Sequence, residues 1–448
     1  MMGIKWPNVN RPVAIAPLAT FRMTFGLLML ISLVRFWARG WITSLYVTPA
    51  FHFTYWGFEW VRPLGDTGMH LLFLTLIVAS ALLMLGLFYR LASVVFFLGF
   101  TYVELLDVTT YLNHYYFISL VAFLLIGLPA NRHYSLDAYF GRVPRSRQVP
   151  LWTIGILRIQ LGLVYVFAGL AKLNADWLLR AEPMKTWLPS KSHLPWVGPF
   201  MYDEWVAYLF SWFGAGYDLF IVFFLLNRKT RPVAYLFVLI FHGATALFFP
   251  GIGMFPYVMI VSSLIFFSGE FHTRLLSFLP VKTLPWDTEP YHHFLPRKMV
   301  MVLLSLYLFF QLLIPLRFLL YPGKLFWTEA GYRFSWRVML MEKAGTAYFI
   351  VKDQTGTQSY AVENQRYLTP LQEKMMSTQP DLILKYARYL AEIFEKKGIK
   401  KPKVYAEIYV ALNGELSRLY VDSTVDLAAE NLSWRPYSWI LPYQTTHE

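Results

Sequence analysis

The chain has 448 residues, of which 56% are hydrophobic, 19% aromatic and only 15% charged. Soluble chains carry about 25% charged residues, so this composition excludes an ordinary soluble protein and is typical of a membrane protein. The net charge of +13 does not indicate a nucleic-acid-binding protein, because the basic residues lie in short loops between apolar runs. Since the chain has no cysteine, disulfides, thiolate catalysis and cysteine-ligated metal sites are excluded.

Apolar runs of membrane-spanning length recur from the N-terminus to about residue 320. The first, from Val13 to Trp37, is too long for the apolar core of a cleavable signal peptide, so we interpret it as a span. About nine spans are predicted, at roughly 13–37, 69–89, 91–110, 114–129, 152–173, 205–227, 232–249, 252–268 and 298–320. Residues 41–62 are too aromatic and too interrupted to span, and we expect an interfacial or re-entrant hairpin there.

Lysine and arginine residues are concentrated in alternate loops of this series. They are Lys5, Arg11, Arg90, Arg132, Arg142, Arg145, Arg147, Arg228, Lys229, Arg231, Arg274 and Lys282. All of them fall on one side of the membrane if the N-terminus is cytoplasmic, as the positive-inside rule requires. The rule is obeyed nearly throughout, and Arg35 and Arg39, after the first span, depart from it. We therefore expect everything after about Gly323 to lie on the outer side, in a periplasm or lumen.

The end of the chain is different in character. Residues 1–325 are predicted to form a helical bundle in the membrane, and residues 326–448, which are polar and mixed in charge, a small α+β domain outside it. Strands are expected at 347–351, 359–362, 403–412 and 416–421, and a helix over 370–397. Asn413-Gly414 is a hairpin turn signal between the last two strands. The predicted fold class is thus a polytopic α-helical membrane protein with a C-terminal α+β domain.

Four polar side chains lie in or beside the predicted spans. Lys172 is at the outer end of the fifth span, and Asn113 and His114 are at the outer start of the fourth. His242 lies about ten residues into the seventh span, and therefore deeper. Ionisable residues inside a membrane are costly to bury and are functional candidates by default. A pocket that opens toward the outer domain would hold all four side chains.

Each of these residues also has an ordinary structural interpretation. Lys172 would snorkel to the headgroups if its stem lay in lipid. His114 would bond a loop at the interface, and His242 a helix carbonyl. Asn113 would cap the fourth helix. The sequence leaves these alternatives open.

The spacing of histidines does not indicate a metal site. No H-x-x-H or H-E-x-x-H pattern occurs, and His292 and His293 are adjacent in a loop. The candidate residues instead predict a partly buried amine, that of Lys172, near histidine and asparagine side chains in an aromatic-rich region that faces the outer leaflet. Burial favours a neutral amine, which suits proton abstraction from a lipid-soluble substrate.

Five stretches of the chain, taken in their order along the sequence, carry a resemblance to a known family. They are Asn113-His114-Tyr115; Tyr165 to Trp177; Phe241-His242 with Ile252 to Phe255 behind it; Trp327 to Trp336; and Lys403 to Leu441. In these stretches, the second above all, the chain resembles the vitamin K-dependent γ-glutamyl carboxylase family and its bacterial relatives with an HTTM-type membrane domain. The resemblance implies a bundle of membrane helices with a lumenal domain, in agreement with the topology expected from the loop charges.

The resemblance also implies a reaction. Lys172 matches the family's base, which deprotonates vitamin K hydroquinone so that O2 can add, and the oxygenated product takes a γ-proton from a glutamate side chain. CO2 then adds to give γ-carboxyglutamate, and the quinone leaves as its 2,3-epoxide. Asn113, His114 and His242 match pocket positions that would stabilise oxyanions and place CO2 or the quinone oxygen. A segment implicated in glutamate binding is matched by Tyr332, Ser335 and Trp336.

The implied partners are a glutamate-containing peptide or protein, a lipid-soluble quinone and membrane lipids, without nucleic acid or metal. The absence of cysteine removes any family disulfide and suits a bacterial inner membrane, with the C-terminal domain in the periplasm. Phe318 stands where the family has a histidine, so an alternative is a hydroquinone epoxidase that carboxylates poorly. A second alternative is a non-enzymatic scaffold or transporter, although the paired broken helices of many transporters are not evident in the sequence.

Overall fold

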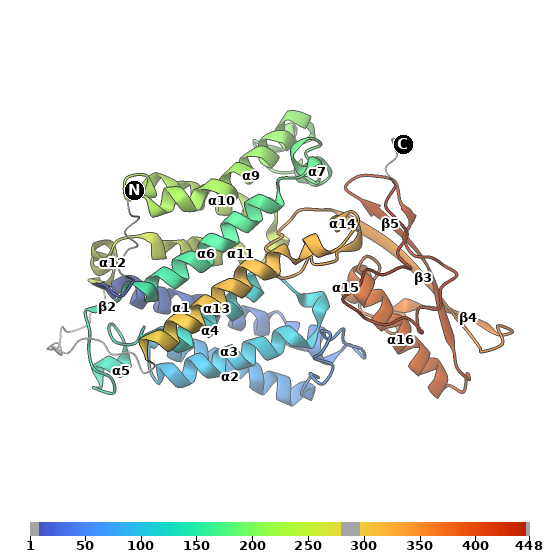
Figure 1. Cartoon of the computed structure of the whole chain (residues 1–448), viewed down its shortest axis with the longest axis horizontal. Coiled ribbons are helices and arrows are strands. Elements are labelled where there is room, and N and C mark those ends of the chain that lie inside the picture. Colours follow the sequence, from blue (N-terminus) through green and yellow to red (C-terminus); the bar gives the residue numbers. More distant parts are fainter. Residues whose placement is uncertain (1–8, 279–295, 445–448) are drawn as a thin grey trace.

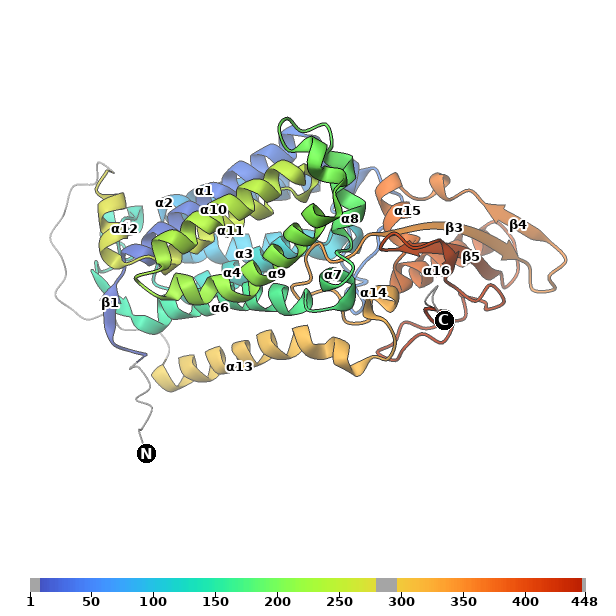
Figure 2. The same cartoon turned by 90° about the horizontal axis from the view of Figure 1, so that it is seen from above.

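The computed structural model describes residues 9–278 and 296–444. Its larger part is a bundle of long helices, and a smaller domain of helices and strands lies at one end of that bundle (Figures 1 and 2). Among the described residues, seven helical segments are long and apolar enough to cross a membrane. They are α1 (Ala16–Ala38), α2 (Gly65–Leu85), α3 (Tyr89–Leu106), α6 (Leu151–Ala171), α9 (Glu204–Leu226), α10 (Arg231–Phe248), and α13 (Arg297–Leu316) with the 3-10 turn that follows it.

Two of the nine predicted spans differ from the others. The fourth is α4 (Asn113–Gly127), a helix of 15 residues, which is shorter than a membrane is thick. The eighth is broken into α11 (Phe255–Ser263) and α12 (Gly269–Leu276), whose axes differ by 116°. The break follows from the sequence, because the Ser268 side chain accepts from the backbone of Phe271 and starts a new helix. Within residues 9–278 and 296–444 the bundle therefore has seven helices that could span a membrane, or eight if this bent pair is counted.

The basic loops meet at the end of the bundle that lies away from the C-terminal domain. There β1 (Pro12–Ala14) pairs with β2 (Gln148–Pro150), next to α5 (Leu136–Tyr139) and α12 (Figure 1). Within this end the guanidinium of Arg22 donates to the carbonyl of Leu83 at 3.0 Å. The basic loops that the sequence placed on one side of the membrane thus lie together at one end of the bundle. Lys5 and Lys282 lie outside the described residues.

The C-terminal domain is an antiparallel sheet with two helices. The sheet has the order β4-β3-β5-β6. Its strands are β3 (Lys343–Lys352), β4 (Ser359–Val362), β5 (Lys403–Leu412) and β6 (Arg418–Leu419). The predicted hairpins are confirmed, but the single helix expected over 370–397 is two, α15 (Pro370–Met376) and α16 (Pro380–Lys396). Pro380 explains the break, because proline lacks an amide hydrogen and favours the first turn of a helix.

The segment 41–62 does not span the bundle, as predicted, and it helps to dock the C-terminal domain. After a short π-helical turn (Thr43–Val47) the chain is irregular. The amide of Gln372 on α15 donates to the carbonyl of Phe51 at 2.7 Å and to Asp107 at 2.9 Å. The ring of Phe51 stacks on Tyr389 of α16, with 4.3 Å between centroids. The predicted domain boundary at residue 325 lies at the start of α14 (Leu325–Thr328).

Candidate active site

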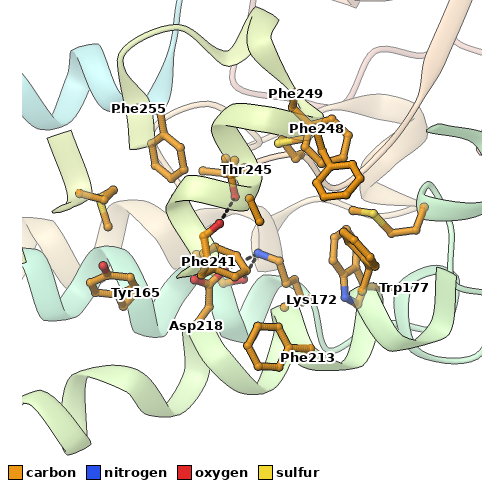
Figure 3. A pocket seen from close by; sticks show the side chains of 18 of the residues that line it. Tyr165, Lys172, Trp177, Phe213, Asp218, Phe241, Thr245, Phe248, Phe249 and Phe255 are labelled. Atoms are coloured by element: carbon orange, nitrogen blue, oxygen red, sulfur yellow. Dashed lines mark hydrogen bonds and ion pairs between the residues drawn. The ribbon is translucent and has the colours of Figure 1, made fainter. Parts of the chain in front are cut away.

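Lys172 lies directly after α6 and its amine points into the bundle. The Nζ atom is 2.6 Å from Oδ2 of Asp218 on α9, and both side chains are buried, with 6% and 9% exposed (Figure 3). The amine is also 5.3 Å from the centre of the Trp177 ring. Lys172 therefore does not snorkel toward headgroups. It belongs to a buried ion pair, which is the arrangement that makes a charge tolerable in a dry interior.

The residues of the Tyr165–Trp177 motif explain this geometry. At Gly169, an added Cβ would lie 2.5 Å from the backbone nitrogen of Leu219, so only glycine lets α6 and α9 approach so closely. After Lys172, the side chain of Asn174 accepts from the backbone of Trp177 and starts α7 (Ala175–Leu178). The indole of Trp177 then donates to the carbonyl of Ser211 on α9 at 2.7 Å. The motif thus holds α6 against α9 and sets Lys172 beside Asp218.

The ion pair faces a cavity of about 330 Å³ that we call the amine chamber. Its lining is aromatic and aliphatic, and Lys172 and Asp218 are its only charged lining groups among the described residues. The rings around the pair are those of Trp177, Phe213, Phe241, Phe248, Phe249 and Phe255 (Figure 3). Three of the lining residues, Leu209, Phe213 and Ile240, are 54%, 43% and 53% exposed on the outside of the bundle. The chamber therefore borders the surface of α9 and α10 that faces lipid.

His242 reaches the amine chamber through a tyrosine. The histidine is 1% exposed on α10, and its Nε2 lies 3.2 Å from the hydroxyl of Tyr165, which lines the chamber. That hydroxyl is also 3.2 Å from Oγ of Ser263 on α11. Nδ1 of His242 has no partner among the described residues. The simple alternative, a histidine bonded to a helix carbonyl, is not what the structure shows.

A second cavity, of about 730 Å³, lies where the bundle meets the C-terminal domain, and we call it the interface chamber. Asn113, His114, Tyr332 and Arg337 line it. The two chambers share four lining residues, Phe249, Phe255, Val338 and Met339. They are therefore neighbours separated by a thin wall of side chains.

Asn113 and His114 are two of the polar residues that the bundle contributes to the interface chamber, together with Tyr111 and Lys191. Asn113 is the first residue of α4 and not its cap; its Nδ2 donates to the carbonyl of Arg337 at 2.8 Å. His114 is 5% exposed, and its Nε2 has no partner among the described residues. The ring of Phe255 lies 6.1 Å from the His114 ring and 5.5 Å from the His242 ring, so it stands in the wall between the two histidines.

The three residues predicted to bind glutamate are placed differently from one another. Tyr332 lines the interface chamber, whereas Ser335 and Trp336 line neither chamber. The Ser335 hydroxyl donates to the carbonyl of Gly331 at 2.6 Å, and the fully buried Trp336 ring stacks on Tyr116 at 5.0 Å. Ser335 and Trp336 thus fix the loop that carries the next residue, Arg337, into the chamber.

Sequence reasoning missed two charged residues of the site. Asp218 carried a signal, since it is a lone carboxylate in the middle of an apolar span. Arg337 carried none, because its burial depends on an irregular loop. As for a metal, the described ranges contain no cluster of three or more histidine, cysteine, aspartate or glutamate residues suited to one, and His292 and His293 lie outside them.

Comparison with known protein families agrees with this arrangement. The family model of the HTTM domain matches residues 10–271, which is more than half of the chain. The model of the vitamin K-dependent gamma-carboxylase lumenal domain matches residues 296–446. The chain belongs to the vitamin K-dependent gamma-carboxylase family. No solved structure matches the chain.

Membership of the gamma-carboxylase family confirms the resemblance seen in the five sequence stretches. The protein is an integral membrane protein of this family, and the family implies the use of vitamin K, O2 and CO2. The HTTM match ends before α13, and the lumenal-domain match includes that helix. Both chambers are lined by residues from the two matched regions, because Val338 and Met339 contribute to each.

Proposed function

We propose that the protein is a vitamin K-dependent γ-glutamyl carboxylase. It would couple oxygenation of vitamin K hydroquinone to the 2,3-epoxide with carboxylation of a glutamate side chain in a peptide or protein. The observation that carries this proposal is the buried Lys172–Asp218 pair, with 2.6 Å between Nζ and Oδ2, in an apolar chamber that adjoins a polar one.

The amine chamber suits the quinone. Its volume of about 330 Å³ is in the range of small-molecule pockets, and its aromatic lining offers faces on which a naphthoquinone ring can stack. The exposed lining residues of α9 and α10 would let a substrate with an isoprenoid tail enter from the lipid and leave its tail there. A chamber of low polarity also suits dissolved O2 and CO2.

The ion pair supplies the base for the first step. Lys172 and Asp218 offer two basic groups that share one proton, so the pair can accept a second proton from a hydroquinone hydroxyl. It would then carry a positive charge beside the new oxyanion, which Coulomb attraction stabilises in a dry chamber. The hydroxyl of Tyr165, held by His242 and Ser263, is a hydrogen-bond donor for the same substrate.

The interface chamber suits the peptide, which approaches from the aqueous domain. Asn113, His114 and Tyr332 would surround the glutamate, and exclusion of water would protect its γ-carbanion until CO2 adds. In the net reaction one oxygen atom of O2 ends in the epoxide and the other in water, while CO2 replaces the γ-proton. The oxygenated quinone must touch the γ-carbon to take this proton, so the side chains that both chambers share, Phe255 and Met339 among them, would have to move aside where the substrates meet.

We further propose a bacterial inner-membrane location, with the N-terminus in the cytoplasm and the C-terminal domain in the periplasm. The support is the concentration of arginines at the end of the bundle opposite that domain. Exceptions are Arg35 and Arg39 at the domain end of α1, Arg180, which pairs with Glu415 of that domain at 3.3 Å, and Lys191, which lines the interface chamber.

A paired assay tests the proposed function. Purified protein in nanodiscs receives reduced vitamin K, O2, labelled CO2 and a short glutamate peptide, with Lys172→Ala alongside. Lys185→Ala, which removes a partly exposed lysine paired with Glu204, is the matched control. We expect epoxide and labelled peptide from the wild type and the control, and a loss of both in Lys172→Ala by about 10²- to 10⁴-fold.

The same assay separates the alternatives. Epoxide without label would favour an epoxidase that does not carboxylate, and Phe318, whose ring lies 4.3 Å from the Arg337 guanidinium carbon, would then be the residue to change to histidine. Neither product from folded wild-type protein would contradict the proposal and favour a scaffold or transporter.

A further inference from the structure

Arg337 is a buried arginine whose side chain has no hydrogen-bond or ion-pair partner among the described residues. It is 7% exposed and lines the interface chamber. Neither a hydrogen bond nor an ion pair of its guanidinium exists within the described ranges, and its Nε is buried without a partner. The other two buried arginines differ: Arg22 and Arg231 donate to backbone carbonyls at 3.0 Å and 2.7 Å.

The acidic residues of the same chamber are already engaged elsewhere. Glu329 forms an ion pair with Lys343 at 2.9 Å, and Glu342 accepts from the indole of Trp187 at 2.5 Å. The neighbouring Arg333 has its own carboxylate, Asp381, at 2.6 Å. The positive charge of Arg337 is therefore not neutralised by the chamber walls.

The surroundings of Arg337 hold the guanidinium in place. Its central carbon lies 4.3 Å from the centre of the Phe318 ring, a stacking distance for a cation on an aromatic face. The backbone carbonyl of Arg337 accepts from Asn113 at 2.8 Å. Burying an unpaired charge is costly, so a ligand that brings the opposite charge is favoured there. The planar fork of arginine matches a carboxylate with two parallel hydrogen bonds.

We propose that Arg337 is the carboxylate receptor of the interface chamber and binds the side-chain carboxylate of the substrate glutamate. The inference rests on the proposed function for the identity of that substrate. Arg337 would hold the γ-carboxylate while the γ-carbon faces the wall shared with the amine chamber. The Phe318 ring supports the guanidinium from one face, which leaves its edge free for the substrate.

A binding experiment without hydroquinone tests this proposal. The probes are an acetylated, amidated pentapeptide with one glutamate among apolar residues, and the same peptide with glutamine. Binding to the full-length protein in nanodiscs is measured by calorimetry for the wild type, Arg337→Gln and Arg337→Lys. The control Lys396→Gln removes a charge from an exposed lysine in the last turn of α16, which lines neither chamber.

We expect the wild type to bind the glutamate peptide about 10- to 100-fold more tightly than the glutamine peptide. Arg337→Gln should abolish this preference without weakening the glutamine peptide, and Arg337→Lys should keep part of it. Lys396→Gln should keep it. Equal binding of the two peptides by the wild type, or a preference that survives in Arg337→Gln, would overturn the proposal.

Thermal unfolding separates a receptor from a structural residue. Because Arg337→Gln removes an unpaired buried charge, the variant should unfold at the wild-type temperature or above it. Loss of the preference together with unfolding of the variant would also overturn the proposal, since Arg337 would then be structural. The two proposals can fail separately. If the wild type makes no epoxide but its preference for the glutamate peptide depends on Arg337, the proposed function is wrong and the assignment of Arg337 as a carboxylate receptor is still supported.

Discussion

Lys172 and Asp218 should behave as one unit, in stability as well as in catalysis. Within the described ranges neither side chain has another ion partner. At 2.6 Å and an effective dielectric constant of about 20, their attraction is about 6 kcal/mol. Removing one partner of a buried pair costs about 3–5 kcal/mol because the other charge is left unpaired, whereas replacing both by apolar residues is often neutral or stabilising.

The perturbation is a double-mutant cycle of Lys172→Met and Asp218→Leu. Each single variant should lower the free energy of unfolding by about 3 kcal/mol, and the double variant should recover most of that loss. Epoxide formation should fall by about 10²-fold or more in either single variant. It should fall no further in the double variant, because residues that act together show non-additive losses.

Unfolding in mixed micelles measures the free energies of unfolding. A hydroquinone-dependent assay measures the rates of epoxide formation. Additive losses of stability in the double variant would refute the view that each charge is compensated by the other. Wild-type epoxide formation in Asp218→Leu would refute the role of the pair as the base.

Three further predictions concern the surroundings of the site. Gly169→Ala should separate α6 from α9 and abolish epoxide formation, since its Cβ would meet the Leu219 backbone at 2.5 Å, whereas Gly155→Ala on the same helix meets nothing within 4 Å and should leave activity intact. Tyr165→Phe should lower the rate of epoxide formation by about tenfold without changing peptide affinity, because it removes the hydroxyl that lies 3.2 Å from His242; an unchanged rate would show that the hydroxyl takes no part. Burial alone would raise the pKa of Asp381, but Arg333 overcomes this and holds the pKa below its ordinary value. The stability from that pair is therefore complete above a pH of about 4, and it should disappear as the pH falls through the lowered pKa. Acid unfolding of the wild type and Asp381→Asn measures it, and identical acid sensitivity would contradict the assignment.

Much of the fold follows from simple sequence rules. Apolar length predicted the helices of the bundle, because a span must bury its backbone polar groups within itself. Alternation and the Asn413-Gly414 turn predicted the strands of the C-terminal domain. Apolar length alone could not show that the eighth run bends, since the bend depends on a helix start at Ser268.

The site was predictable only in part. Lys172, His114 and His242 could be selected as candidates because polar residues in an apolar run are conspicuous, but contacts between helices depend on packing. The approach of Asp218 to Lys172 is set by a glycine contact between α6 and α9. The burial of Arg337 depends on a loop in which Glu329, Phe334, Trp336 and Met339 all have positive φ angles, between 52° and 59°. Such residues rarely adopt that conformation, so no local pattern predicts the loop.

The division of the two substrates between two chambers is tested most directly by electron cryomicroscopy of the protein in nanodiscs, without O2, with reduced vitamin K and a glutamate peptide. This division predicts the quinone ring in the amine chamber, with a hydroxyl oxygen about 3 Å from the Lys172 amine or the Asp218 carboxylate, and the peptide in the interface chamber. Quinone density only in the interface chamber, or an amine chamber filled by lipid while both substrates bind elsewhere, would contradict it.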